Sequence, residues 1–322
     1  MNRPIKIAGA VVALFLLTGV LVAAWSGAAS ERILSRTFEV HTIDFPVPFP
    51  LTEDEVDEAD LAPEEVEEVA LARAIERGRH LVESRYACSD CHGADFGGGV
   101  MVDAPPIGSL LGPNLTLGEG SRTLDYTPAD WDAIVRHGVR ADGLPAVMPS
   151  SEFGSMSDQE LSDIIAYIRA QPPVDAAVPE RTLGPLGKLL VARGDFQLSA
   201  DRMASVTQHD GLPPVAEVTL AFGEHLAAPC SGCHGQELTG GAIPGGDPSW
   251  APARNLTPHE DGLAGWSFED FEGAMRSGVR PDGTALLLPM TLALPYTANL
   301  TDVEMRALWL YLESLDPIVT PG

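Results

Sequence analysis

The sequence is poor in positive charge. Lysine and arginine together number 20 against 46 aspartates and glutamates, and the formal net charge is −26 at pH 7. Without residues 1–30 the chain holds 18 basic and 46 acidic residues, formally −28. This balance excludes nucleic acid as a partner and argues against docking on anionic lipid. It favours a protein partner with a basic docking face.

Cysteine is also scarce, and its placement is informative. The chain has four cysteines, all within two C-x-x-C-H pentapeptides at 88–92 and 230–234. In this signature of c-type haem attachment, two thiols form thioethers to the porphyrin and the histidine becomes an axial iron ligand. We therefore predict two covalently bound haem c groups. The predicted cofactor-binding residues are Cys88, Cys91, Cys230 and Cys233, and the predicted proximal iron ligands are His92 and His234.

Three other uses of such cysteines fit less well. A disulfide framework does not explain a histidine after each pair. A Cys₄ zinc site usually has a much shorter gap than the one between the two pairs here. A thioredoxin-like motif requires a βαβ context, which the sequence does not show.

The two pentapeptides head two internal repeats, at an offset that stays between 140 and 145 residues. Such self-similarity indicates two copies of one structural unit. The matched segments are 78–81 with 223–226, 93–99 with 235–241, 114–116 with 255–257, 138–143 with 278–283, and 157–168 with 301–312.

The repeats read as helical, and we predict an all-α fold. Ser157 and Thr301 are typical N-caps, each followed three residues later by glutamate as in a capping box. Apolar residues at helical spacing follow both caps, and no long alternating strand pattern occurs. The helices are expected at about 63–83, 128–138, 158–170, 216–227, 267–277 and 302–315.

Methionine is the common second iron ligand of cytochromes c. Met148 and Met290 each follow their motif histidine by 56 residues, so we predict both as iron ligands. Most methionines are core filler, which is the interpretation for Met156, Met275 and Met305. Met290 is the weaker candidate, because its proline precedes it and the loop after it is two residues longer. A distal histidine is the alternative, and His80 and His225 recur at equivalent positions.

With these motifs the chain resembles the two-domain dihaem cytochromes c of bacterial periplasms and membranes, over about 68–175 and 214–322. The resemblance implies two small all-α cytochrome c domains with His/Met coordination at both irons. It also implies that the carbonyl of Pro113 holds the first proximal histidine ring. The second repeat departs from this pattern, with Arg254 at the matching place.

The N-terminal segment 1–30 is predicted to be a membrane anchor, or else a cleaved signal. Residues 7–25 are strongly apolar and follow a positive start, which fits a single helix crossing the inner membrane with the haem domains in the periplasm. Signal cleavage would instead leave a soluble periplasmic protein. Residues 31–67 are expected as an acidic tether or docking patch. Domain 1 spans 68–175, the linker 176–213 and domain 2 214–322.

These features predict an electron carrier and no catalytic residues. Six-coordinate haem iron has no open site for substrate, so the chain is expected to pass single electrons between periplasmic or membrane redox proteins. One alternative is the cytochrome subunit of a membrane-bound dehydrogenase complex. Another is a dihaem peroxidase-like enzyme with an open second haem.

Overall fold

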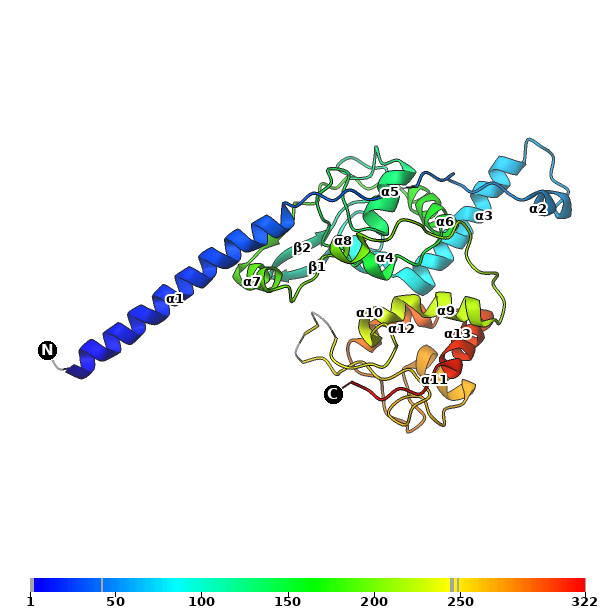
Figure 1. Cartoon of the computed structure of the whole chain (residues 1–322). Coiled ribbons are helices and arrows are strands. Elements are labelled where there is room, and N and C mark those ends of the chain that lie inside the picture. Colours follow the sequence, from blue (N-terminus) through cyan, green and yellow to red (C-terminus); the bar gives the residue numbers. More distant parts are fainter. Residues whose placement is uncertain (1–2, 42, 244–245, 248, 322) are drawn as a thin grey trace.

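A long N-terminal helix leads into two helical domains that pack against each other (Figure 1). The structure is a computed structural model and describes residues 3–41, 43–243, 246–247 and 249–321. Helix α1 (Arg3–Leu34) includes a segment, Gly9–Leu34, that is long and apolar enough to cross a membrane. Its last turns pack on α7 (Pro185–Arg193), where Ser26 and Ser30 of α1 are buried. The end of this helix therefore packs on the linker that follows domain 1.

Each domain is built around one pair of crossing helices. In the first domain α3 (Val66–Leu81) crosses α6 (Asp158–Arg169), and in the second α9 (Leu220–Ala227) crosses α13 (Asp302–Ser314). Both crossings depend on glycine. A Cβ on Gly78 would lie 2.0 Å from the carbonyl oxygen of Asp163, and a Cβ on Gly223 would lie 2.0 Å from that of Ala307. Only glycine permits this backbone approach, which explains its recurrence in the two repeats.

The helices with predicted capping boxes begin where the sequence predicts. Ser157 and Thr301 each accept a hydrogen bond from the backbone of the glutamate three residues later, completing the two capping boxes. The predicted helices near 128–138 and 267–277 are α5 (Pro128–Val135) and α11 (Phe268–Ser277). The all-α class is thus confirmed for the bulk of both domains.

A small sheet in the first domain was not predicted. Strands β1 (Gly99–Ala104), β2 (Gly108–Gly112) and β3 (Thr182–Leu183) pair antiparallel in that order. A register shift between Val100 and Val102 interrupts the alternation of β1, which is why periodicity did not reveal it. The sheet is an addition to a mostly helical fold and holds the start of the linker against domain 1.

The shorter elements carry the motifs and connect the domains. They are α2 (Glu53–Glu58), η1 (Val82–Tyr86), α4 (Cys88–His92), η2 (Ser150–Glu152), α8 (Ser199–Met203), η3 (Ala228–Cys230), α10 (Ser231–His234) and α12 (Met290–Thr297).

The segments around domain 1 pack onto it. Phe45, from the segment expected as an acidic tether, is buried in the domain 1 core, and the Ser162 hydroxyl donates to the carbonyl of Pro46. The start of the linker also packs on domain 1, since the side-chain amide of Asn114 donates to the carbonyl of Ala176 at 3.1 Å. Since its strand β3 also pairs with β2, the linker wraps around domain 1.

Candidate haem sites and the interface between them

The first C-x-x-C-H motif forms the short helix α4 at the wall of a mainly apolar cavity. Cys88, Cys91, His92 and Met148 all line this cavity, together with apolar side chains such as Trp131. A flat, largely apolar macrocycle requires such a lining, with thiols and two potential iron ligands facing one space. The residues present therefore fit a covalently attached haem.

His92 is prepared to act as an iron ligand. It is 9% exposed, and its Nδ1 donates to the carbonyl of Pro113 at 2.9 Å. Burial lowers the pKa of His92, so the imidazole is neutral at physiological pH. With its hydrogen on Nδ1, the ring keeps the Nε2 lone pair for the metal. The Pro113 carbonyl expected from the family resemblance is in place.

The four motif cysteines form no disulfide bond with one another. Burial raises the pKa of Cys88 to about 12 and that of Cys230 to about 11. Burial also raises the pKa values of Cys91 and Cys233. The thiols therefore favour their protonated form in this environment.

The proximal histidine of the second motif is held in the same way, although the residue that accepts its hydrogen bond is an arginine and not a proline. His234 is 8% exposed, and its Nδ1 donates to the carbonyl of Arg254 at 2.6 Å. The departure from proline at position 254 therefore leaves the hydrogen bond intact, because the acceptor belongs to the backbone. Burial lowers the pKa of His234 as it does that of His92.

The two methionine segments differ more than their equal spacing indicates. The two domains share one backbone hydrogen bond just before the methionine. The N–H of Ala146 donates to the carbonyl of Gly138 after α5, and the N–H of Leu286 donates to the carbonyl of Gly278 after α11. Met148 comes two residues after this hydrogen bond and lines the haem cavity. Met290 comes four residues after it, at the first turn of α12, and packs on the domain 2 core. The segment predicted as a loop is thus partly helical.

The rival ligands His80 and His225 have other partners. Nε2 of His80 lies 2.9 Å from both carboxylate oxygens of Glu304 in the other domain, and Nε2 of His225 lies 2.8 Å from Oε1 of Glu160. In each pair the histidine of one domain contacts the glutamate of the other, and both histidines and both glutamates are at equivalent positions of the repeats. The recurrence of these histidines therefore reflects a reciprocal contact between the domains.

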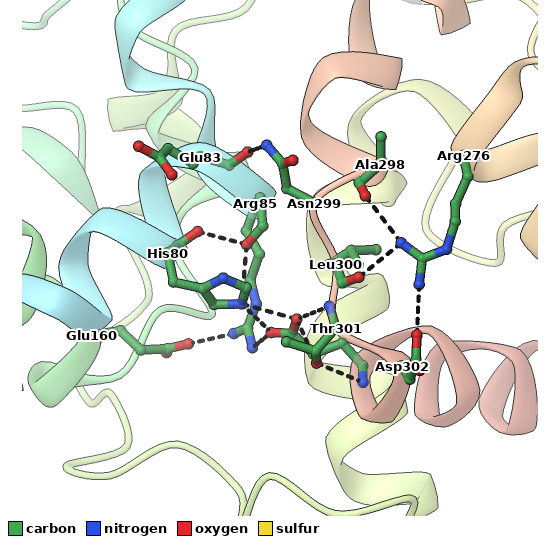
Figure 2. Close-up of polar contacts among 12 residues, drawn as sticks. His80, Glu83, Arg85, Glu160, Arg276, Ala298, Asn299, Leu300, Thr301 and Asp302 are labelled. Carbon is green, nitrogen blue, oxygen red and sulfur yellow. Dashed lines mark hydrogen bonds and ion pairs between the residues drawn. The ribbon is translucent and has the colours of Figure 1, made fainter.

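Arg85 lies between these two pairs. Its Nη1 donates to Glu160 at 2.9 Å and its Nη2 to Glu304 at 2.6 Å, while Figure 2 shows its guanidinium between Glu160 and the start of α13. Its side chain is 10% exposed. The sequence does not distinguish Arg85 from other arginines, because it lies outside the matched segments and has no basic counterpart at the corresponding place, Ala227.

The same interface contains the residues between the motif cysteines. The Tyr296 hydroxyl of α12 donates to the carboxylate of Asp90 and lies 3.4 Å from Ser89 Oγ. On the other side, a Cβ on Gly232 would lie 2.3 Å from the Glu152 carboxylate of η2. Each domain thus touches the other's attachment motif with the segment that follows its candidate methionine.

Comparison with known families agrees with this architecture. Residues 73–168 match the family model for cytochrome c oxidase, cbb3-type, subunit III, and residues 221–316 match the model for cytochrome c. Each match contains one C-x-x-C-H motif. The chain is therefore a dihaem cytochrome c with two tandem cytochrome c domains and two covalent haem c groups, and it belongs to the electron carriers.

Several curated proteins resemble most of the chain. The gluconate 2-dehydrogenase cytochrome c subunit of Pantoea cypripedii is 29% identical over 75% of this chain and 59% of its own length. The fructose dehydrogenase cytochrome subunit of Gluconobacter japonicus is 25% identical over 75% of this chain and 52% of its own length. A "diheme cytochrome c-type" protein of Cereibacter sphaeroides is 25% identical over 72% of this chain and 82% of its own length. The chain thus spans between half and three fifths of the dehydrogenase subunits.

Proposed function

We propose that this chain is the electron-accepting cytochrome subunit of a membrane-bound dehydrogenase complex. Cys88 and Cys91 hold the first haem with His92 and Met148 as iron ligands. Cys230 and Cys233 hold the second with His234 and Met290. Each haem supplies one-electron exchange between ferric and ferrous iron. Residues 68–175 and 214–322 are the domain limits in this proposal.

The arrangement of the two motifs is the observation that carries this proposal. Ser89 and Asp90 contact Tyr296, and Gly232 lies against Glu152, so both attachment motifs border one interface. A buried ion-pair network fixes the domains relative to each other across it. An electron accepted at one domain can then pass to the other without dissociation of a partner. We take the electron donor to be a dehydrogenase because the similar proteins are named as cytochrome subunits of dehydrogenases.

The N-terminal helix supports a place at the membrane. In the proposal, α1 remains uncleaved as a single-pass inner-membrane anchor, and the haem domains lie in the periplasm. Its last turns pack on α7, a contact that signal cleavage would remove. Intact α1 in mature protein, seen by mass spectrometry, would support the anchor, whereas cleavage near residue 30 would refute it.

Co-purification tests the dehydrogenase assignment. The chain is tagged at its C-terminus and extracted in mild detergent, and the eluate is assayed for dye-linked oxidation of sugars and alcohols. The proposal predicts a stoichiometric dehydrogenase subunit that reduces both haems when substrate is added. A haem protein that elutes alone and stays oxidised with every substrate contradicts it. Arg85→Ala serves as a comparison, because it disturbs the domain interface and leaves both motifs intact.

A free dihaem carrier is the second candidate function. The Cereibacter sphaeroides protein supports it, because the match covers most of that protein's length. In this case the chain elutes without a dehydrogenase yet exchanges electrons with small periplasmic redox proteins. A positively charged partner is expected from the charge of the chain, so the exchange rate should fall steeply with salt.

A further inference from the structure

Asp132, His137 and His209 form a buried cluster that haem binding does not use. Nε2 of His137 and Nε2 of His209 lie 3.1 Å apart, and Oδ1 of Asp132 lies 3.8 Å from the first and 4.0 Å from the second. All three side chains are at most 2% exposed. Asp132 belongs to α5, His137 follows that helix, and His209 comes from the linker.

The hydrogen bond of the His209 ring directs one lone pair toward His137. Nδ1 of His209 donates to the carbonyl of Gly154 at 2.9 Å, which leaves its Nε2 as an acceptor. Nδ1 of His137 is buried and has no hydrogen-bond partner. When the hydrogen of His137 is on Nδ1, the Nε2 lone pair of His137 faces the Nε2 lone pair of His209. Two lone pairs at 3.1 Å repel unless a cation lies between them.

The surrounding charge favours a cation. The Arg136 guanidinium donates to Asp132 Oδ1 and to Asp158 Oδ1, both at 2.7 Å. One buried guanidinium and two carboxylates leave a local formal charge of −1. Oδ1 of Asp132 still has a lone pair for a further partner, since a carboxylate oxygen carries two.

We propose that Asp132, His137 and His209 bind one divalent metal ion of the zinc class. Two imidazoles and a carboxylate are typical zinc ligands, with a water in the fourth position. Tetrahedral zinc places its nitrogen ligands about 3.3 Å apart, close to the 3.1 Å observed here. Asp132 moves by roughly half an ångström to complete the site. The Gly154 carbonyl fixes the tautomer of His209, as carbonyls do around metal-bound histidines.

The ion would fasten the linker to the segment that carries Met148. The Ser199 hydroxyl of α8 donates to the carbonyl of Met148 at 2.8 Å, and His209 follows α8 in the same linker. Binding therefore joins α5, the methionine segment and the linker in domain 1. Domain 2 has Ser277 in place of His137, so one ion is expected per chain of two haems.

Metal analysis of the full-length protein with its haems tests the site. Zinc and iron are measured by mass spectrometry after growth with added zinc, with the two haem irons as the internal standard. The proposal predicts one zinc for every two irons, removed by a strong chelator and restored by titration with zinc chloride. His209→Ala and His137→Ala should weaken zinc binding at least about 100-fold, more than the loss of an outer-shell partner. The control, His259→Ala in domain 2, should leave it unchanged.

The wild-type protein alone can overturn the proposal. The proposal is wrong if the wild-type protein contains less than a tenth of a zinc ion per chain and zinc chloride gives no heat of binding. Its melting temperature is also the same with zinc as with chelator. The two histidines then share a simple N–H···N hydrogen bond. These readings do not depend on the folding of any variant or on electron transfer, so they also remain valid if the dehydrogenase assignment fails.

Discussion

The Nη2 atom of Arg85 in the first domain lies 2.6 Å from Oε1 of Glu304 in the second. Glu304 also completes the capping box of α13, so one carboxylate both stabilises the start of a helix and binds the neighbouring domain. Glu160 has the same two functions in domain 1, where it completes the capping box of α6 and accepts from Arg85. The helix that closes each cytochrome fold thus also fixes the relative position of the two domains.

Removal of Arg85 should therefore destabilise the protein strongly. Arg85→Ala leaves two buried carboxylates facing each other without their common cation, and a broken buried pair costs about 3–5 kcal/mol. The free energy of unfolding from urea denaturation measures the loss. Arg79→Ala is the matched control, because Arg79 pairs with Glu76 and Glu83 at the exposed surface of α3, the helix directly before η1. Equal effects of the two variants would contradict the role of Arg85.

The interface should lose stability in acid. Burial raises the pKa of the Glu304 carboxyl, but the hydrogen bond from His80 and the charge of Arg85 outweigh it and lower that pKa to about 2. A carboxyl with a lowered folded-state pKa stabilises the protein above its unfolded value, near 4.5. That stability, on the order of 3 kcal/mol, is lost as the pH falls from about 4.5 toward 2.

Glu304→Gln tests this acid dependence. The variant should be less stable at pH 7 and should show a shallower loss of stability between pH 4.5 and 2 than the wild type. Denaturant unfolding across this pH range gives both values. Glu313→Gln, an exposed change on the same helix, should follow the wild-type curve. An unchanged pH slope in Glu304→Gln would show that this carboxyl does not carry the effect.

Arg254 should be dispensable for the second haem. His234 donates to the backbone carbonyl of residue 254, which any residue supplies. Arg254→Ala should leave the absorption spectrum and both reduction potentials unchanged. Potentiometric titration of the variant beside the wild type measures this. A shift confined to one haem would mean that the arginine side chain, and not only its carbonyl, acts on His234.

The helix crossings should not accept a methyl group. Gly78→Ala and Gly223→Ala each place a Cβ 2.0 Å from a carbonyl oxygen, so the helices must separate. Overpacking of this kind costs about 1–3 kcal/mol. Gly273→Ala is the matched control, since its Cβ meets no atom within 4 Å in α11 and should be neutral or stabilising. Thermal unfolding of the three variants compares them.

The sequence predicts those parts of the fold that depend on local chemistry. The capping boxes at Ser157 and Thr301 locate their helices, and the two pentapeptides locate the haem motifs. The sheet escaped prediction because β1 is irregular, and Arg85 escaped because its partners lie 75 and 219 residues away. His80 and His225 show a third kind of limit. Their recurrence was a real signal, but sequence alone does not distinguish a haem ligand from an interface residue.

The most direct test of the account is a spectroelectrochemical titration of wild type, Met148→Ala and Met290→Ala. Methionine ligation raises the potential of a haem, so its loss should lower it. The account predicts two one-electron steps in the wild type, with one step lowered in each variant and the other unchanged. If Met290→Ala leaves both steps and the spectrum as in the wild type, Met290 is not a ligand and the second haem is coordinated differently.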